Sequence, residues 1–134
     1  MSEVFLLDTN AVISIFSGNE DLITLLDKVE EAGGEFRYSA MTAGEIAAGL
    51  HHYEETEVIE DFLTETEFEE VTSTLMIRAG RLRSNRIKWG VKSVKLPDAI
   101  ILATALDNNW TLVSNDAHME LIEELGGKLK KFVL

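Results

Sequence analysis

The feature that most constrains the fold is a series of short apolar runs separated by segments with helical periodicity. Residues 4–7 (VFLL) form an apolar run that ends at Asp8, which is typical of a strand buried on both faces. Strands alternating with helices predict a mostly parallel sheet of 4–5 strands inside a three-layer α/β/α domain. The expected strands are 4–7, 36–39, 68–71, 111–114 and 129–134, and the expected helices are 11–29, 40–53, 54–66, 73–87, 98–107 and 117–124.

The helix expected at 54–66 is amphipathic. Its apolar side chains Val58, Ile59, Phe62 and Leu63 recur at helical spacing and are expected to face the core. Such an apolar face also suits an interface between subunits.

Length and composition indicate one domain spanning 1–134. A chain of 134 residues with 46% hydrophobic and 27% charged residues is ordinary for a globular protein. It contains no cysteine, which excludes disulfides and thiol catalysis. No apolar run approaches the roughly 20 residues that span a bilayer, and the first residues lack the basic region of a secretory signal. We therefore expect a cytoplasmic protein that does not enter the membrane.

Charge is distributed unevenly along the chain. The net charge of −12 argues against a partner rich in phosphates, because such binding needs clustered Lys and Arg. Residues 54–70 hold nine acids and no base, whereas residues 71–97 hold seven of the twelve bases and no acid. This asymmetry indicates a basic stripe on an acidic body, although a solvated helix face explains the charges equally well.

Four acids follow the predicted strands. Asp8 ends the first strand, Asp116 lies just beyond the strand at 111–114, Glu45 lies in the helix after the second strand, and Asp98 opens a helix after Pro97. In open parallel sheets, ligands bind at the carboxyl ends of the strands. Carboxylates gathered there repel one another unless a cation binds, and Mg²⁺ or Mn²⁺ prefers oxygen ligands. The supporting polar oxygens near this edge belong to Asn10, Thr42, Ser114 and Asn115.

Each acid also has a purely structural interpretation. Thr42-x-x-Glu45 matches a capping box, Asp98 suits a helix dipole, and Asp116 and Asp8 each suit a helix N-cap. Asp8 fits this interpretation least, because a carboxylate at the end of an apolar central strand is costly without a partner. That all four acids serve only as caps is the less favoured alternative.

The order of four motifs resembles the PIN-domain family, and within it the VapC-type toxins of toxin–antitoxin pairs. The resemblance covers the whole chain. Each motif is weak alone, but the four in this order are specific. They are residues 5–10 (FLLDTN), 39–50 (SAMTAGEIAAGL), 95–105 (KLPDAIILATA) and 112–116 (LVSND).

The resemblance implies a Mg²⁺- or Mn²⁺-dependent endoribonuclease. Asp8, Glu45, Asp98 and Asp116 take the catalytic, metal-binding positions by this resemblance, with Glu45 acting directly or through water. It also implies an RNA substrate, an antitoxin partner and a homodimer. Met119 stands where the family often has an aromatic residue, and Ser114 where Thr is common, which leaves the subfamily and substrate open.

The basic segment leads directly to Asp98, so it is expected to guide RNA to the metal site. The residues expected to bind RNA are Arg81, Arg83, Arg86 and Lys88. His118 lies two residues after Asp116 and suits a phosphate contact, although a passive surface histidine is the more ordinary interpretation.

Three other functions fit parts of the pattern. A PIN nuclease of RNA processing has the same motifs, and a non-catalytic PIN-like binding module would keep the fold without productive metal binding. A phosphoacceptor receiver domain is disfavoured, because it needs paired acids at the first strand and a late Lys. Here Asp8 stands alone and residues 114–116 (SND) replace that Lys.

Overall fold

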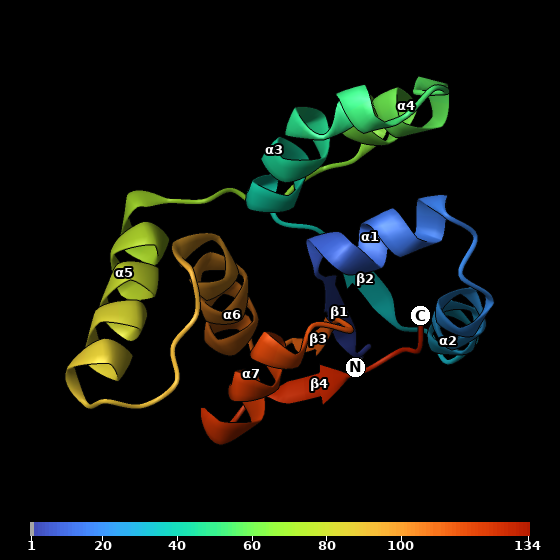
Figure 1. The fold of residues 1–134 in the computed structure, drawn as a ribbon. Coiled ribbons are helices and arrows are strands. Elements are labelled where there is room, and N and C mark those ends of the chain that lie inside the picture. The colour runs from blue at the N-terminus through green and yellow to red at the C-terminus, as the bar shows by residue number, and fades with distance from the viewer. Residues whose placement is uncertain (1) are drawn as a thin grey trace.

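Four parallel strands form the centre of the computed structural model, which describes residues 2–134 (Figure 1). They are β1 (Val4–Leu7), β2 (Glu35–Arg37), β3 (Thr111–Val113) and β4 (Lys128–Lys130). The order across the sheet is β2-β1-β3-β4, and all three neighbouring pairs are parallel. This confirms the α/β class and the predicted parallel sheet of 4–5 strands.

Helices cover both faces of the sheet. Within residues 2–134 they are α1 (Thr9–Phe16), α2 (Glu20–Glu31), α3 (Ala40–Ala48), α4 (Glu57–Glu65), α5 (Ser73–Lys88), α6 (Leu96–Asn108) and α7 (Leu121–Glu124), with short 3-10 helices at Leu50–His52 and Ala117–Glu120. Gly18, with φ of +74°, turns the chain between α1 and α2. None of the helices in this part of the chain is long and apolar enough to cross a lipid bilayer.

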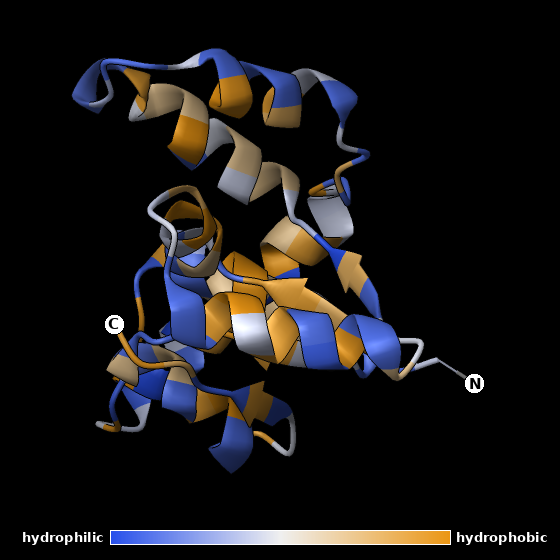
Figure 2. Ribbon diagram, turned by 90° about the vertical axis from the view of Figure 1, so that its right-hand side faces the viewer, coloured by the Kyte–Doolittle hydropathy of each residue, from blue (hydrophilic) through white to orange (hydrophobic). Residues whose placement is uncertain are grey.

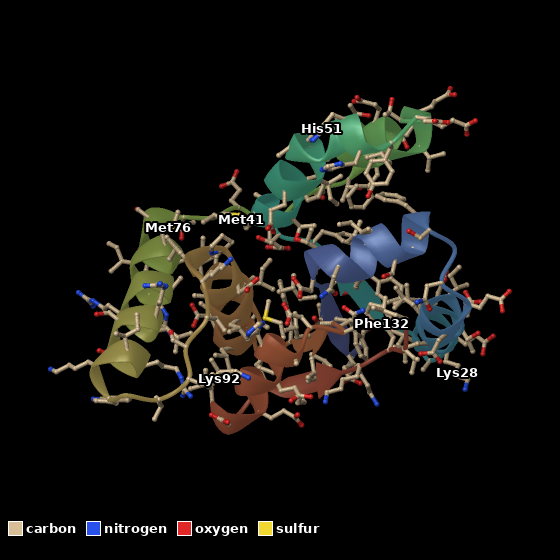
Figure 3. All side chains as sticks on the ribbon, viewed as in Figure 1. Lys28, Met41, His51, Met76, Lys92 and Phe132 are labelled. Carbon is tan, nitrogen blue, oxygen red and sulfur yellow. The ribbon has the colours of Figure 1, made fainter. Side chains whose placement is uncertain are left out.

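Successive residues of β1 point to opposite faces and build two cores. Leu6 packs with the apolar face of α6 and with α5 and α7, whereas Phe5 and Leu7 pack with α1 to α4. All three side chains are buried, which explains why β1 is apolar at every position. Figure 2 shows the apolar strands lying in the middle of the molecule. Phe132, just after β4, joins the α1–α2 core (Figure 3).

An aromatic cluster centred on Phe62 packs α4 against α1 and against the residue that follows β2. The Phe62 ring meets those of Phe16, Tyr38 and Phe68 edge-on, with centroids 5.2–5.5 Å apart. Edge-to-face pairs of this kind are each worth about 0.5–1.5 kcal/mol beyond the area they bury. On the other side of the molecule, α5 packs along α6 (Figure 1). The site described below lies between these two parts.

Several local predictions were wrong. The helical segment expected at 11–29 is two helices, separated at residues 17–19, and the strand expected at 129–134 ends at Lys130. The strand expected at 68–71 is only an isolated bridge between Glu69 and Ser39, because the chain enters α3 at Ala40 and offers no longer strand for pairing. Val58 was expected to face the core, but 69% of it is exposed, while Ile59, its neighbour on α4, is buried. Val58 lies at the margin of the apolar stripe, and nothing packs over it.

Candidate active site

The strand order creates a crevice at the carboxyl ends of β1 and β3. From β1 the chain crosses to β2 on one side, whereas β3 lies on the other side, so the connections that leave β1 and β3 diverge between them. Asp8 follows β1 directly, and Ser114 and Asp116 follow β3. Two of the four predicted acids, Asp8 and Asp116, therefore meet with Ser114 at the point of this sheet where its topology favours a ligand.

Asp8 is the deepest acid of the site. Only 5% of it is exposed, and its two oxygens accept hydrogen bonds of 2.8 Å from the Thr9 amide and the Ser114 hydroxyl. The pKa of Asp8 is raised from 3.8 to about 6, mainly by burial and to a smaller extent by the charges of Asp98 and Asp116, while the two hydrogen bonds oppose the rise. A carboxylate held in this way is poised to bind a cation.

Ser114 connects the two strand ends. Its buried hydroxyl donates to Asp8 Oδ2 and accepts from the Asp116 amide at 3.1 Å. The Asn10 side chain lies beside it, donating to Ser114 Oγ at 3.3 Å and accepting from the Asn115 amide at 3.4 Å. The structure thus brings the predicted supporting residues Asn10, Ser114 and Asn115 together around Asp8.

Asp98 and Asp116 form the middle of the site. Asp98 lies in the first turn of α6, where burial raises its pKa, and the charges of Asp116 and Glu45 raise it further. Opposing these effects, His118 and Lys95 lower the pKa of Asp98. Asp116 Oδ1 accepts from the His118 amide at 2.9 Å and lies 3.1 Å from His118 Nδ1. Mutual repulsion between the carboxylates shows that they share one electrostatic environment.

Glu45 is the outermost acid, and its capping-box interpretation was wrong. The N-cap of α3 is Ser39, whose hydroxyl accepts from the Met41 amide, so Thr42 lies inside the helix. Glu45 Oε1 instead accepts a 2.8 Å hydrogen bond from the hydroxyl of Thr9, which also lies 3.0 Å from Thr42 Oγ1. Glu45 is therefore oriented toward β1 by a neighbour of Asp8.

Thr9 is the site residue that the sequence analysis missed. It links the first acid to the second, although 36 residues separate it from Glu45. Its position directly after Asp8 was the available signal, but a hydroxyl at the start of a helix is usually a cap. Here that capping role is filled by Asp8 itself, whose side chain accepts from the Thr9 amide.

Three of the four structural interpretations hold together with the functional one, because Asp98 lies in the first turn of α6 as the helix-dipole interpretation expects. Asp8 caps α1 and Asp116 caps the 3-10 helix at Ala117–Glu120. Each cap occupies one carboxylate oxygen. The other oxygen of Asp8 faces Ser114 across the crevice. Capping and membership of the site are therefore not exclusive.

The donor set fits a hard divalent cation. The acids supply only oxygen ligands, which Mg²⁺ and Mn²⁺ prefer. Within residues 2–134, no Lys or Arg lies within ion-pair distance of Asp8, Asp98 or Glu45, so their charge lacks a direct counter-ion. The same part of the chain contains no group of three acids or histidines already close enough to hold a metal. The acids are close enough to affect one another's pKa, but among the described residues they do not form a preassembled metal site.

A cavity of about 480 Å³ opens beside Asp98 and Asp116. Acids and His118 form one wall, and α5 and the loop that follows it form the other. The remaining lining residues are Arg83, Ile87, Ser93, Val94 and Lys95.

The four residues predicted to bind RNA have different positions. Arg83 lines the cavity, whereas Arg81 and Lys88 are exposed on other faces of α5. Arg86 is engaged within the fold, because its side chain is only 12% exposed, bonds Glu124 at 3.1 Å and donates to the carbonyl of Lys92. Only Arg83 of the four stands beside the acids.

The comparisons with known proteins agree with this geometry. The model of the PIN domain matches residues 5–125. No curated protein sequence matches this chain.

Several solved structures share the fold. The chain is similar to VapBC2 from Rickettsia felis bound to a DNA fragment from its promoter, with 20% identity, 97% of this chain and 99% of that chain covered, and a TM-score of 0.75. The DNA-bound VapBC from Salmonella typhimurium has 22% identity, 98% of each chain covered and a TM-score of 0.75. A toxin–antitoxin complex from Klebsiella pneumoniae has 28% identity, 86% and 87% covered, and a TM-score of 0.64. The resemblance seen in the sequence motifs is confirmed.

Proposed function

This chain belongs to the PIN-domain family, and on that premise we propose that it is a metal-dependent endoribonuclease, the toxin of a VapBC-type pair. The observation that carries the proposal is the gathering of Asp8, Asp98, Asp116 and Glu45 at one crevice, where burial and, to a smaller extent, the neighbouring acids raise the pKa values of Asp8 and Asp98. A fold gains nothing in stability by placing unpaired carboxylates together, so their arrangement favours a bound cation.

The proposed reaction is hydrolysis of an RNA phosphodiester. A bound Mg²⁺ or Mn²⁺ would lower the pKa of a water molecule and neutralise charge on the phosphate. Asp8, Asp98 and Asp116 would hold the ion, with Glu45 as a further ligand, directly or through water. Ser114 fixes the orientation of Asp8, and Thr9 fixes that of Glu45, whereas the acids would still have to move closer together when the ion binds.

An antitoxin and a second copy of the chain are the proposed protein partners, in a cytoplasmic protein whose single PIN-like domain spans 1–134. The similar structures from Rickettsia felis and Salmonella typhimurium are of VapBC and the one from Klebsiella pneumoniae is of a toxin–antitoxin complex, and an acidic crevice offers a counter-charge to basic side chains of an inhibitor. Exposed apolar side chains along α5 and directly after it, notably Ile77 and Trp89, support a subunit interface.

Incubation of the purified protein with total RNA tests the nuclease proposal. We expect cleavage with Mn²⁺ or Mg²⁺, none with EDTA, and none from the Asp8→Asn variant. Asp27→Asn is the matched control, because Asp27 is an exposed acid of α2 outside the site. Mapping the new ends would give the cleaved sequence. Absence of cleavage by the wild type with either ion would contradict the proposal.

Expression in a bacterial host separates the toxin from the alternatives. Arrested growth with the wild type but not with Asp8→Asn would support the toxin. Cleavage in vitro without growth arrest would favour a nuclease of RNA processing. A protein that neither cleaves RNA nor binds Mn²⁺ would be the non-catalytic binding module.

A further inference from the structure

We propose that the cavity beside Asp98 and Asp116 is a nucleotide-binding subsite, in which Arg83 and Lys95 bind an RNA phosphate and Ile87 and Val94 contact the base. This rests on the proposed nuclease function and adds the residues that would place the strand next to the acids. Arg83, Ile87 and Val94 lie outside the four motifs, and the motif that begins at Lys95 does not itself assign Lys95 a role.

The cavity brings opposite charges together from separate parts of the chain. Arg83 and Ile87 lie one turn apart on α5, so both face the same side of that helix. Lys95 immediately precedes α6 and lies three residues before Asp98, close enough that its charge lowers the pKa of that acid. A phosphate bound by the two cations would therefore lie directly beside the carboxylates.

The two cations are available for a ligand. Within residues 2–134, neither Arg83 nor Lys95 forms an ion pair, although the chain has 24 acids and 12 bases. On the same helix, Arg78 pairs with Asp107, and Arg86 pairs with Glu124. Among the described residues Arg81 and Lys88 of α5 also form no ion pair, so what distinguishes Arg83 and Lys95 is that both line one cavity beside the acids, where they can bind an anion from outside.

Hydrogen bonds connect α5, which carries Arg83, to the loop that ends at Lys95. Arg86 donates to the carbonyl of Lys92, and the hydroxyl of Ser93 donates to the carbonyl of Arg83 at 3.3 Å. These bonds tie the loop between α5 and α6, where Figure 3 labels Lys92, back onto α5. Val94, the next residue along, is buried. The engaged side chain of Arg86 therefore positions the subsite without itself contacting RNA.

The size and lining of the cavity suit one nucleotide. Its volume of about 480 Å³ falls within the range of about 300–1,000 Å³ for small-ligand pockets. Ile87 and Val94 provide an aliphatic surface for a base, and Ser93 adds a polar group. A single base enters such a cavity only when it is unpaired, so an unpaired RNA segment is the occupant.

RNA binding by an inactive protein tests the subsite. In the Asp8→Asn background, a fluorescent single-stranded RNA oligonucleotide is titrated against Arg83→Gln and Lys95→Gln at several salt concentrations. Each substitution should weaken binding about tenfold, the effect of losing one hydrogen bond to a charged group. Each should also reduce the slope of log K against log salt by about 0.7, the value for one phosphate contact on a single strand.

Arg81→Gln and Lys88→Gln are the matched controls. They remove the same charge from exposed positions of α5 that do not line the cavity, and we expect less than a twofold change in affinity. Arg83→Lys should keep most of the binding, because it retains the positive charge. Thermal melting of each variant verifies that these surface substitutions leave the fold intact.

The outcomes separate this inference from the nuclease proposal. Equal losses from the cavity and control variants would overturn the subsite, even if the wild type cleaves RNA. A selective loss from Arg83→Gln and Lys95→Gln would support the subsite, even if the wild type cleaves nothing. Failure of the Asp8→Asn protein to bind RNA at low salt would also overturn it.

Discussion

Replacement of Asp8 by Asn should stabilise the metal-free protein while abolishing cleavage. The carboxyl of Asp8 is buried, and its pKa is raised from 3.8 to about 6. A rise of this size corresponds to about 3 kcal/mol of free energy that the folded state loses when Asp8 ionises. Asparagine has nearly the same shape and carries no charge, so it removes this cost.

The hydrogen bonds of Asp8 reduce the expected gain. Its two oxygens accept from the Thr9 amide and the Ser114 hydroxyl, whereas an Asn side chain has only one acceptor oxygen. Loss of one hydrogen bond costs about 1 kcal/mol, which leaves a net stabilisation of about 2 kcal/mol. With an unfolding entropy of about 2.1 cal/mol/K per residue, this raises Tm by about 7 °C.

The stabilisation expected from Asp8→Asn depends on pH and decreases on acidification. Below about pH 4, Asp8 is protonated in both the folded and the unfolded state, so its ionisation costs nothing. Between pH 4 and 6 the unfolded chain ionises first, and the folded state loses stability until the pH exceeds its own pKa of about 6. The advantage of Asp8→Asn should therefore be full at pH 7.5 and lost at pH 4, where the small remaining ionisation cost no longer offsets the missing hydrogen bond.

Urea unfolding with EDTA present measures this effect. The wild type and Asp8→Asn are compared at pH 7.5, 5.5 and 4, with Asp27→Asn as the control for loss of an exposed acid. If Asp8→Asn proved less stable than the wild type at pH 7.5, or if its advantage did not shrink on acidification, the inferred cost of ionising Asp8 in the folded state would be wrong.

Three further predictions concern the site and its frame. Thr9→Val removes the hydroxyl that orients Glu45 and should lower kcat about tenfold, whereas Thr9→Ser should restore it; steady-state cleavage rates test this. The cleavage rate should fall about tenfold per pH unit below pH 6, because protons compete with the cation for Asp8, and a pH–rate profile measures the slope. Gly127→Ala should cost about 1–3 kcal/mol in urea unfolding without changing the active fraction, because its Cβ would lie 2.5 Å from the Ile122 side chain.

The parallel sheet and the position of Asp8 were predictable from the sequence. The apolar run of β1 has no polar position because both faces are covered, and this pattern is visible in the residues alone. Asp116 could be placed at this edge because parallel strands end together, and Asp98 because α6 leads into β3, so the start of α6 lies at the carboxyl edge of the sheet. The site follows from topology once the strands are recognised.

The parts that could not be predicted depend on long-range contacts. The partner of Glu45 is Thr9, and no local pattern distinguishes that hydrogen bond from a capping box. The roles of Arg83 and Arg86 differ because Glu124 and the loop carbonyl of Lys92 lie beside only one of them. Charge along the sequence therefore identified the basic helix but not the cation that faces the acids.

Direct titration of Mn²⁺ tests the central claim, that the acids at the ends of β1 and β3 form a site for a divalent cation. Calorimetry at pH 7.5 should show saturable binding to the wild type and to Asp27→Asn, and no binding to Asp98→Asn. Asp98 is suited to this test because its half-buried carboxyl has no cationic partner within ion-pair distance among residues 2–134. Absence of binding to the wild type, or equal binding to Asp98→Asn, would contradict the account.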